Sequence, residues 1–148
     1  FDWIVLATGS TGTQAGLVAG LHQLGYQGSV LGVSVRQPRD KQINAVHSLC
    51  QRTLTKLGVD DEIPVSKIKV DDGYVGGGYG IPANSTLEAI TIAARYEGLL
   101  LDPVYSGKGF AGMLGMARAD FFKPTDKVLF LHTGGSSALF AYEDVIVS

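Results

Sequence analysis

Short apolar runs alternate with longer amphipathic stretches along most of this chain, and this alternation constrains the fold more than any other feature. Short apolar runs are typical of buried strands, whereas apolar side chains that recur every three or four residues are typical of helices. We predict strands over residues 4–7, 30–35, 67–70 and 127–132, and helices over residues 14–24, 39–57, 85–96 and 108–121. This order predicts an α/β fold, with an open, mainly parallel sheet and helices on both faces.

Local signals mark several helix ends. Gly25 and Gly58 follow the first two helices, where glycine commonly ends a helix. Asn84 or Ser85 is expected to cap the third helix, and Glu88 lies three residues after Ser85, as in a capping box. The fourth helix is rich in Gly, Ala and Met and must pack closely against its neighbours. The tail, residues 138–147, is compatible with either a strand or a helix.

The composition limits the class of protein. A chain of 148 residues with 45% hydrophobic residues can form one domain, or most of one, with a sizeable core. The formal net charge of −2 gives neither a basic footprint for nucleic acid nor a polybasic face for a membrane. Cys50 is the only cysteine, so the chain forms no internal disulfide, which suits the cytoplasm; a secreted protein without disulfides is the alternative.

The chain starts abruptly, because Phe1 is not Met and an apolar strand follows almost at once. We therefore expect residues 1–148 to be a fragment or a cleavage product of a longer protein, with an N-terminal part missing.

The segment from Thr8 to Thr13, called the phosphate loop below, has the composition of an anion site. It joins a buried strand to a helix and contains two glycines, together with the hydroxyls of Ser10, Thr11 and Thr13. Backbone N–H groups, hydroxyls and the positive end of the helix dipole all favour a bound phosphate. An ordinary tight turn would require fewer hydroxyls and glycines.

Motifs of common nucleotide-binding sites are missing from the chain, which limits the phosphate compounds that the loop could bind. No Walker lysine follows the phosphate loop, and the G-x-G-x-x-G fingerprint of dinucleotide sites is absent. Arg36 stands where many NAD sites carry an acid, so an NADP-dependent reductase is one alternative. The spacing of Tyr105 and Lys108 differs from the Tyr-x-x-x-Lys of short-chain dehydrogenases, which weakens that alternative.

Three further polar segments follow apolar ones: the glycine-rich loop of residues 73–82, residues 101–109, and residues 131–137. Loops after parallel strands share one edge of the sheet, so we expect all of them to form one site with the phosphate loop. In the glycine-rich loop, Tyr74 or Tyr79 is expected to project toward a ligand; a flexible surface loop with aromatic anchors is equally compatible with this composition.

Other polar residues fit ordinary structural roles. His22 and His47 lie in predicted helices, and residues 60–62 form an acidic stretch typical of a solvated loop. Asp71 and Asp72 have no His or Cys spaced to complete a metal site, so no metal is expected.

Taken in order, four stretches resemble the family of D-cysteine desulfhydrases and 1-aminocyclopropane-1-carboxylate deaminases, which includes L-cysteate sulfo-lyase. They are Thr8-Gly9-Ser10-Thr11-Gly12-Thr13-Gln14-Ala15-Gly16, Tyr79-Gly80-Ile81-Pro82, Asp102-Pro103-Val104-Tyr105-Ser106-Gly107-Lys108 and His132-Thr133-Gly134-Gly135. The resemblance implies the tryptophan-synthase-β type of fold (fold type II), with pyridoxal 5′-phosphate as cofactor and a small amino acid as substrate. It spans nearly the whole chain, and the third stretch is the most specific.

The resemblance also implies roles for individual residues. Residues that would hold the cofactor phosphate are Gly9, Ser10, Thr11, Gly12 and Thr13. Tyr79 and Tyr105 would face the substrate, and Ser106 would lie at the pyridine nitrogen. The deaminases carry Glu after the second tyrosine and the desulfhydrases a hydroxyl residue, so Ser106 favours β-elimination over ring opening.

One departure from the family is large. The lysine that binds the cofactor aldehyde lies upstream of the matched region in the family, and no lysine of this chain matches it. The resemblance therefore implies that residues 1–148 are the C-terminal part of a pyridoxal-phosphate-dependent catalytic domain, whose N-terminal part carries the missing lysine. It also implies that the full-length protein is a β-eliminating lyase and a homodimer, and that this chain is inactive in isolation. Open alternatives are the deaminase, the sulfo-lyase, a non-catalytic anion-binding fragment and the NADP-dependent reductase.

Overall fold

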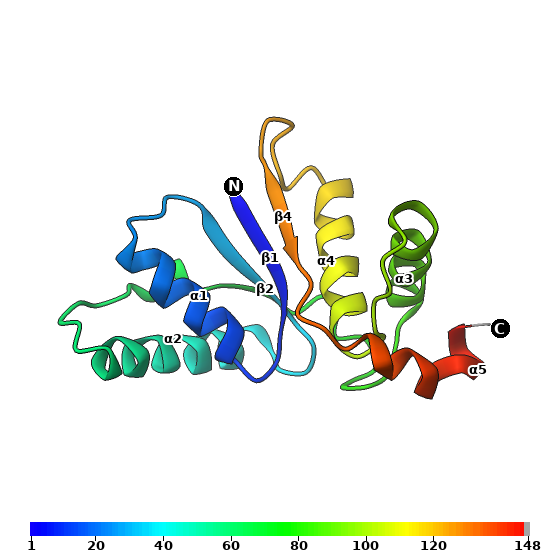
Figure 1. Cartoon of the computed structure of the whole chain (residues 1–148), viewed down its shortest axis with the longest axis horizontal. Coiled ribbons are helices and arrows are strands. Elements are labelled where there is room, and N and C mark those ends of the chain that lie inside the picture. Colours follow the sequence, from blue (N-terminus) through cyan, green and yellow to red (C-terminus); the bar gives the residue numbers. More distant parts are fainter. Residues whose placement is uncertain (147–148) are drawn as a thin grey trace.

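The computed structural model describes residues 1–146. Its sheet contains four parallel strands in the order β3-β2-β1-β4 (Figure 1). The strand bounds are β1 Trp3–Thr8, β2 Ser29–Ser34, β3 Lys69–Asp71 and β4 Val128–Leu131. All four strands lie within two residues of their predicted starts.

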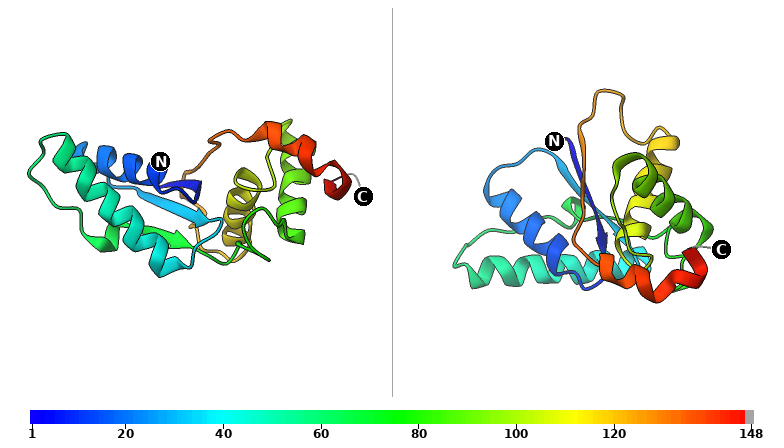
Figure 2. Two further views of the ribbon diagram at one scale, coloured as in Figure 1. Left: turned by 90° about the horizontal axis from the view of Figure 1, so that it is seen from below. Right: turned by 45° about the vertical axis from the view of Figure 1, so that its right-hand side comes forward.

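Helices cover both faces of this sheet. α1 (Gly12–Gln23) and α2 (Arg39–Lys56) pack together on one side, whereas α3 (Asn84–Glu97) and α4 (Ser106–Arg118) lie on the other (Figures 1 and 2). Shorter elements are the 3₁₀ helices η1 (Val65–Lys67) and η2 (Ser136–Tyr142), and α5 (Glu143–Ile146). The predicted open, parallel α/β fold is therefore confirmed.

The two faces of β1 belong to two different parts of the core. Ile4 and Leu6 lie in the cluster formed with α1 and α2, whereas Val5 lies in the cluster on the α4 side. Successive side chains of a strand point to opposite faces, so an almost continuous apolar run is what a strand buried on both faces requires.

Glycines let α4 approach the sheet closely. A Cβ atom on Gly112 would lie 2.7 Å from Cγ2 of Val33 in β2, and one on Gly109 would lie 3.0 Å from the backbone nitrogen of Ala7. The composition of this helix predicted close packing, and the structure confirms it.

The start of α3 differs from the prediction. Ala83 is the N-cap, and its N–H donates to Oγ1 of Thr86 at 3.4 Å, so neither Asn84 nor Ser85 caps the helix. Glu88 forms an ion pair with Arg118 of α4 at 2.8 Å instead. The predicted capping box is wrong because the chain enters the helix one residue earlier, which places Thr86 at the third helical position.

The apolar run of residues 99–101 lies between α3 and α4 and forms no strand. Gly98 ends α3 in a left-handed conformation (φ 65°), and the chain then turns directly toward α4, which begins two residues earlier than predicted. Leu101 is buried against α3 and so explains the apolar character. The described tail is helical from residue 136 to 146, and Val147 lies outside the described residues.

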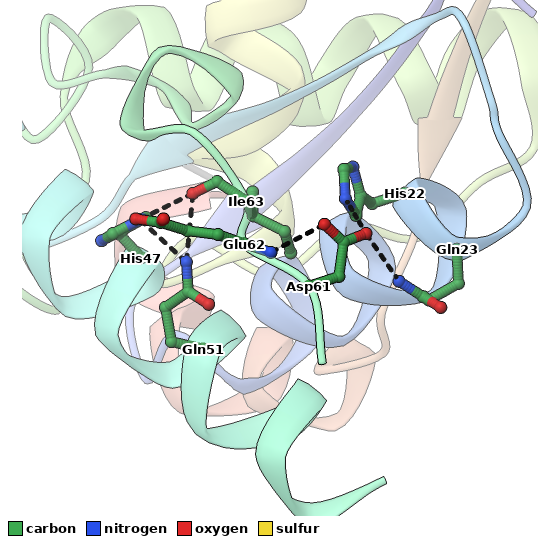
Figure 3. A network of polar contacts seen from close by, with 7 residues as sticks. All are labelled: His22, Gln23, His47, Gln51, Asp61, Glu62 and Ile63. Carbon is green, nitrogen blue, oxygen red and sulfur yellow. Dashed lines mark hydrogen bonds and ion pairs between the residues drawn. The ribbon is translucent and has the colours of Figure 1, made fainter. Parts of the chain in front are cut away.

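The acidic loop after α2 is tied to both helices of its layer (Figure 3). The Asp61 carboxylate contacts His22 of α1 at 2.9 Å, and the Ile63 carbonyl accepts from His47 of α2 at 2.8 Å. The pKa of Asp61 is lowered, first by the N–H of Glu62 and then by His22. Both histidines therefore have structural partners, as expected.

Among residues 1–146, no helix is both long and apolar enough to cross a membrane.

Candidate cofactor and substrate site

The predicted loops meet at the carboxyl edge of the sheet, where they enclose a cavity of about 260 Å³. Its lining residues come from β1, the phosphate loop, the segment after β2, the glycine-rich loop, the start of α4 and the loop after β4: Ala7, Gly9, Ser10, Thr13, Arg36, Tyr79, Tyr105 and Thr133. Parallel strands place their carboxyl ends on the same side, which is why segments so distant in sequence converge here.

The phosphate loop presents an uncapped helix start to this cavity. Thr11 precedes α1 in a left-handed conformation (φ 71°), and no side chain in the described part of the chain caps the helix. The hydroxyl of Thr11 donates to the Ser10 carbonyl, whereas the side chains of Ser10 and Thr13 line the cavity. Because the first N–H groups of a helix have no partner within it, this end can bind an anion.

Gly9 and Gly12 serve the loop in different ways. A Cβ on Gly9 would lie 2.9 Å from Cγ2 of Val35, so only glycine allows the loop to pass this close to the end of β2. A Cβ on Gly12 would meet no described atom within 4 Å, which leaves the backbone of the first helical residue open to a ligand. The donors and the open backbone fit a phosphate group.

Two tyrosines from different segments meet across the cavity. The hydroxyls of Tyr79 and Tyr105 are hydrogen-bonded to each other, and their rings are edge-to-face with centroids 5.7 Å apart. Tyr74, the other tyrosine of the glycine-rich loop, packs instead in the core beside Gly112 and Gly115 of α4. The structure thus places Tyr79, and not Tyr74, at the site. We call Tyr79 and Tyr105 the tyrosine pair.

The start of α4 is organised by a buried carboxylate. Asp102 accepts the N–H groups of Val104, Tyr105 and Ser106 at 2.7–2.8 Å, and it accepts the hydroxyl of Ser106 at 2.6 Å. Its side chain is fully buried. An acid shortly before a helix commonly holds the first N–H groups in this way, so the position of Asp102 ahead of α4 is a signal for this role in the sequence.

Ser106 is itself buried, and its hydroxyl also accepts the N–H of Asp102 at 2.8 Å. It is not one of the residues that line the cavity. The loop after β4 rests against the same carboxylate, because a Cβ on Gly135 would lie 2.6 Å from Oδ1 of Asp102.

Lys108 is a second residue that sequence reasoning did not assign. It is fully buried in α4, and its ammonium donates to the carbonyls of Val75 and Gly78 at 2.6 Å each. Burial lowers the pKa of this lysine. Nothing in the spacing around Lys108 points to partners thirty residues away.

Arg36 adds positive charge at the phosphate-loop side of the cavity. It is exposed and forms no ion pair with any residue among those described. The described residues also contain no group of three or more His, Cys, Asp or Glu side chains that could hold a metal ion.

Comparison with known proteins identifies the family. Residues 1–134 match the model of the pyridoxal-phosphate dependent enzymes, so the chain belongs to that family. The match favours pyridoxal phosphate over the NADP alternative that Arg36 raised.

Particular relatives refine this assignment. The chain is 44% identical over 142 residues to D-cysteine desulfhydrase of Yersinia pestis (strain Pestoides F) and 39% identical to that of Serratia proteamaculans (strain 568). Each alignment covers 96% of this chain and 42% of the relative. A solved structure described as an ACC deaminase homologue matches with a TM-score of 0.86 and 35% identity, over 99% of this chain and 43% of that one.

These relatives confirm the resemblance deduced from the four stretches. The chain spans about two-fifths of the length of the curated relatives that it matches.

Proposed function

We propose that the protein containing this chain is a pyridoxal-phosphate-dependent lyase that performs β-elimination on a small sulfur-containing amino acid. D-cysteine is the proposed substrate, and pyruvate, ammonia and sulfide are the products. The observation that carries the proposal is the cavity, whose lining combines the tyrosine pair with an uncapped helix start that suits a phosphate. The names of the D-cysteine desulfhydrase relatives support this choice of substrate.

We propose that the phosphate loop holds the cofactor phosphate. The residues concerned are Gly9, Ser10, Thr11, Gly12 and Thr13. Ser10 and Thr13 donate hydroxyls, and the backbone of the first turn of α1 donates N–H groups. Bonds to a charged acceptor are stronger than those between neutral groups, so this loop can supply much of the affinity.

When bound, pyridoxal phosphate withdraws electrons from the α-carbon of an amino acid, which acidifies the α-proton and lets a β-substituent leave. The tyrosine pair is suited to hold or pass a proton at its phenol oxygens beside the substrate. The family resemblance supports the proposal that Ser106 faces the pyridine nitrogen with a neutral hydroxyl, although in this structure that hydroxyl is bonded to Asp102 and Ser106 does not line the cavity. The lysine that binds the aldehyde is proposed to lie N-terminal to this chain, in the same protein.

A second candidate is favoured by one observation, the solved structure described as an ACC deaminase homologue. Ring opening of 1-aminocyclopropane-1-carboxylate would use the same phosphate loop and tyrosine pair. Ser106 argues against it, because a hydroxyl cannot enforce protonation of the pyridine nitrogen as a carboxylate can.

The deciding experiment incubates the purified full-length protein with pyridoxal phosphate and, separately, D-cysteine, L-cysteate and 1-aminocyclopropane-1-carboxylate. We expect sulfide and pyruvate from D-cysteine at the highest kcat/KM. Sulfite from L-cysteate, or ammonia from the cyclopropane compound, at a higher kcat/KM would replace the proposed substrate. Failure to bind pyridoxal phosphate would refute the proposal as a whole.

The tyrosine pair is tested by Tyr79→Phe and Tyr105→Phe, with Tyr96→Phe as the matched control because Tyr96 is exposed in α3 and does not line the cavity. Loss of a positioned proton donor or acceptor should lower kcat by about 10²-fold or more. Cofactor affinity should change little, since the phosphate loop is intact. Equal activity of the site variants and the control would contradict the assigned role.

We also propose a cytoplasmic location and a homodimer. The lone, buried Cys50 supports the first, because such a thiol needs no oxidising compartment. The family resemblance supports the second, which sedimentation of the full-length protein would test.

A further inference from the structure

The buried ammonium of Lys108 has no carboxylate partner among residues 1–146, although its side chain is 0% exposed. Instead, it donates to two carbonyl oxygens of the glycine-rich loop, those of Val75 and Gly78, at 2.6 Å each. An isolated buried charge is costly unless hydrogen bonds compensate for the lost water. In this structure, both hydrogen bonds of the Lys108 ammonium go to the glycine-rich loop.

The two carbonyls lie in a segment whose glycines give its backbone high conformational freedom. Gly76, Gly78 and Gly80 all have positive φ angles, and glycine loses more conformational freedom on ordering than any other residue. Gly78 directly precedes Tyr79. On the other side of Tyr79, the Gly80 carbonyl accepts the hydroxyl of Tyr142 at 2.8 Å. Side chains from α4 and η2 therefore hold both carbonyls that flank Tyr79.

Lys108 also belongs to the same helical turn as the second tyrosine of the pair. Tyr105 is the N-cap residue of α4, and its carbonyl accepts the N–H of Gly109 at 2.9 Å. One rigid turn thus carries Tyr105 and, three residues later, the ammonium that holds the loop bearing Tyr79. The turn that carries Tyr105 is thus connected through Lys108 to the loop that carries Tyr79.

We propose that Lys108 is a positioning residue, whose buried ammonium holds the glycine-rich loop so that Tyr79 stays against Tyr105. This inference rests on the proposed function, because it concerns the arrangement of the proposed tyrosine pair. Tyr142 also holds the loop, on the other side of Tyr79, through its hydrogen bond to the Gly80 carbonyl.

A covalent role for Lys108 is the competing explanation. A buried lysine with a lowered pKa is also what an aldehyde-binding lysine requires. However, Nζ of Lys108 is engaged with two loop carbonyls, and Lys108 is not among the residues that line the cavity. Borohydride reduction of the cofactor-bound full-length protein, followed by peptide mass spectrometry, should therefore find the cofactor on another lysine. Cofactor trapped on Lys108 would overturn the proposal.

The positioning role is tested in the full-length protein with Lys108→Met, with Lys41→Met as the matched control because Lys41 is exposed in α2. Amide hydrogen exchange over residues 73–82 should accelerate by about tenfold or more in Lys108→Met, since local opening becomes easier, and should be unchanged in Lys41→Met. Exchange in α1 should stay the same in both. This measurement needs no cofactor and no substrate, so it distinguishes failure of this inference from failure of the proposed function.

Steady-state kinetics of single and double variants test whether Lys108 affects activity through Tyr79. If it does, Lys108→Met should lower kcat on D-cysteine, and adding it to Tyr79→Phe should lower kcat by less than about threefold further, because residues that act as a unit are not additive. Cofactor affinity should change by less than about threefold, since the phosphate loop is separate. Lys108→Arg, which keeps the charge, should restore part of the loop protection.

Tyr142→Phe keeps the test decisive if Lys108→Met does not fold, because it removes one hydrogen bond to Gly80 without emptying the core. It should accelerate exchange over residues 76–82 and lower kcat, both by less than Lys108→Met does where that variant folds. Unchanged loop exchange in these variants, or fully additive effects with Tyr79→Phe, would overturn the proposal.

Discussion

At the scale of single residues, the cysteine shows how burial controls chemistry. Cys50 lies fully buried in α2, and its thiol contacts the Ala15 carbonyl at 3.5 Å. Burial raises the pKa of this thiol to about 11, from 9.0. Because the thiolate is the reactive form, the native protein holds very little of it at pH 8.

We predict that Cys50 reacts with a thiol reagent about a hundredfold more slowly in the native protein than in urea, because burial raises the pKa of its thiol to about 11. The measurement is the rate of alkylation at pH 8, read from the peptide that contains Cys50. The urea-unfolded sample is the control. Similar rates in both states would show that the thiol is accessible in the folded protein.

At the scale of elements, the contact between α4 and the sheet depends on the absence of side chains. Gly112 faces Val33, with no room for a methyl group, whereas Gly16 in α1 faces open space, with no described atom within 4 Å of an added Cβ. Replacing glycine by alanine should therefore have opposite effects on the free energy of unfolding in the two helices.

Gly112→Ala is expected to lower the free energy of unfolding by about 1–3 kcal/mol, because overpacking forces Val33 or the helix to move. Gly16→Ala is expected to raise it by about 0.5–1 kcal/mol, because alanine favours the helix over the unfolded chain. Urea unfolding of the full-length protein compares the two. If Gly112→Ala were neutral, the α4–sheet contact would be looser than described.

At the scale of the whole molecule, each of the two helical layers that cover the sheet has an ion pair at its surface. Asp61 is bound to His22 of α1, and Glu88 of α3 is bound to Arg118 of α4. The pKa of Glu88 is lowered by the Arg118 guanidinium, and that of Asp61 by the N–H of Glu62 and by His22. Both carboxyls are solvent-exposed, so their contribution is modest.

The sign of the pH dependence follows from these lowered pKa values. A carboxyl with a lowered pKa stabilises the folded state above its ordinary range, and this stabilisation is lost as the pH falls through that range toward the lowered value. We predict that the urea midpoint falls between about pH 5 and pH 3, and that it falls less in the double variant Asp61→Asn/Glu88→Gln.

Asp60→Asn is the control for this experiment, because Asp60 is exposed and forms no hydrogen bond with a described residue. It should leave the pH dependence as it is in the unmodified protein. An identical acid response of the double variant and the unmodified protein would contradict the contribution assigned to these two carboxyls.

The largest difference between expectation and structure lies at the start of α4. The fourth helix was predicted from residue 108, whereas α4 begins at Ser106, and the apolar run before it is buried by α3, through Leu101, rather than by sheet neighbours. The loop nevertheless reaches the site, because Asp102 draws the first turn of α4 into place. An apolar run predicts that its side chains are buried, but it does not tell whether a helix or a neighbouring strand buries them.

The sequence by itself determined the strands, the main helices, the parallel sheet and the position of the phosphate loop between β1 and α1. These features depend on periodicity and on residues close together in the chain, which spacing can reveal. The composition of the glycine-rich loop left Tyr74 and Tyr79 open, and the family resemblance pointed to Tyr79; the tertiary structure shows Tyr79 in the cavity lining and Tyr74 in the core. Only the tertiary structure showed that the Lys108 ammonium donates to two carbonyls of that loop. Such contacts join residues about thirty positions apart, and they exist only once the sheet has brought its loops to one edge.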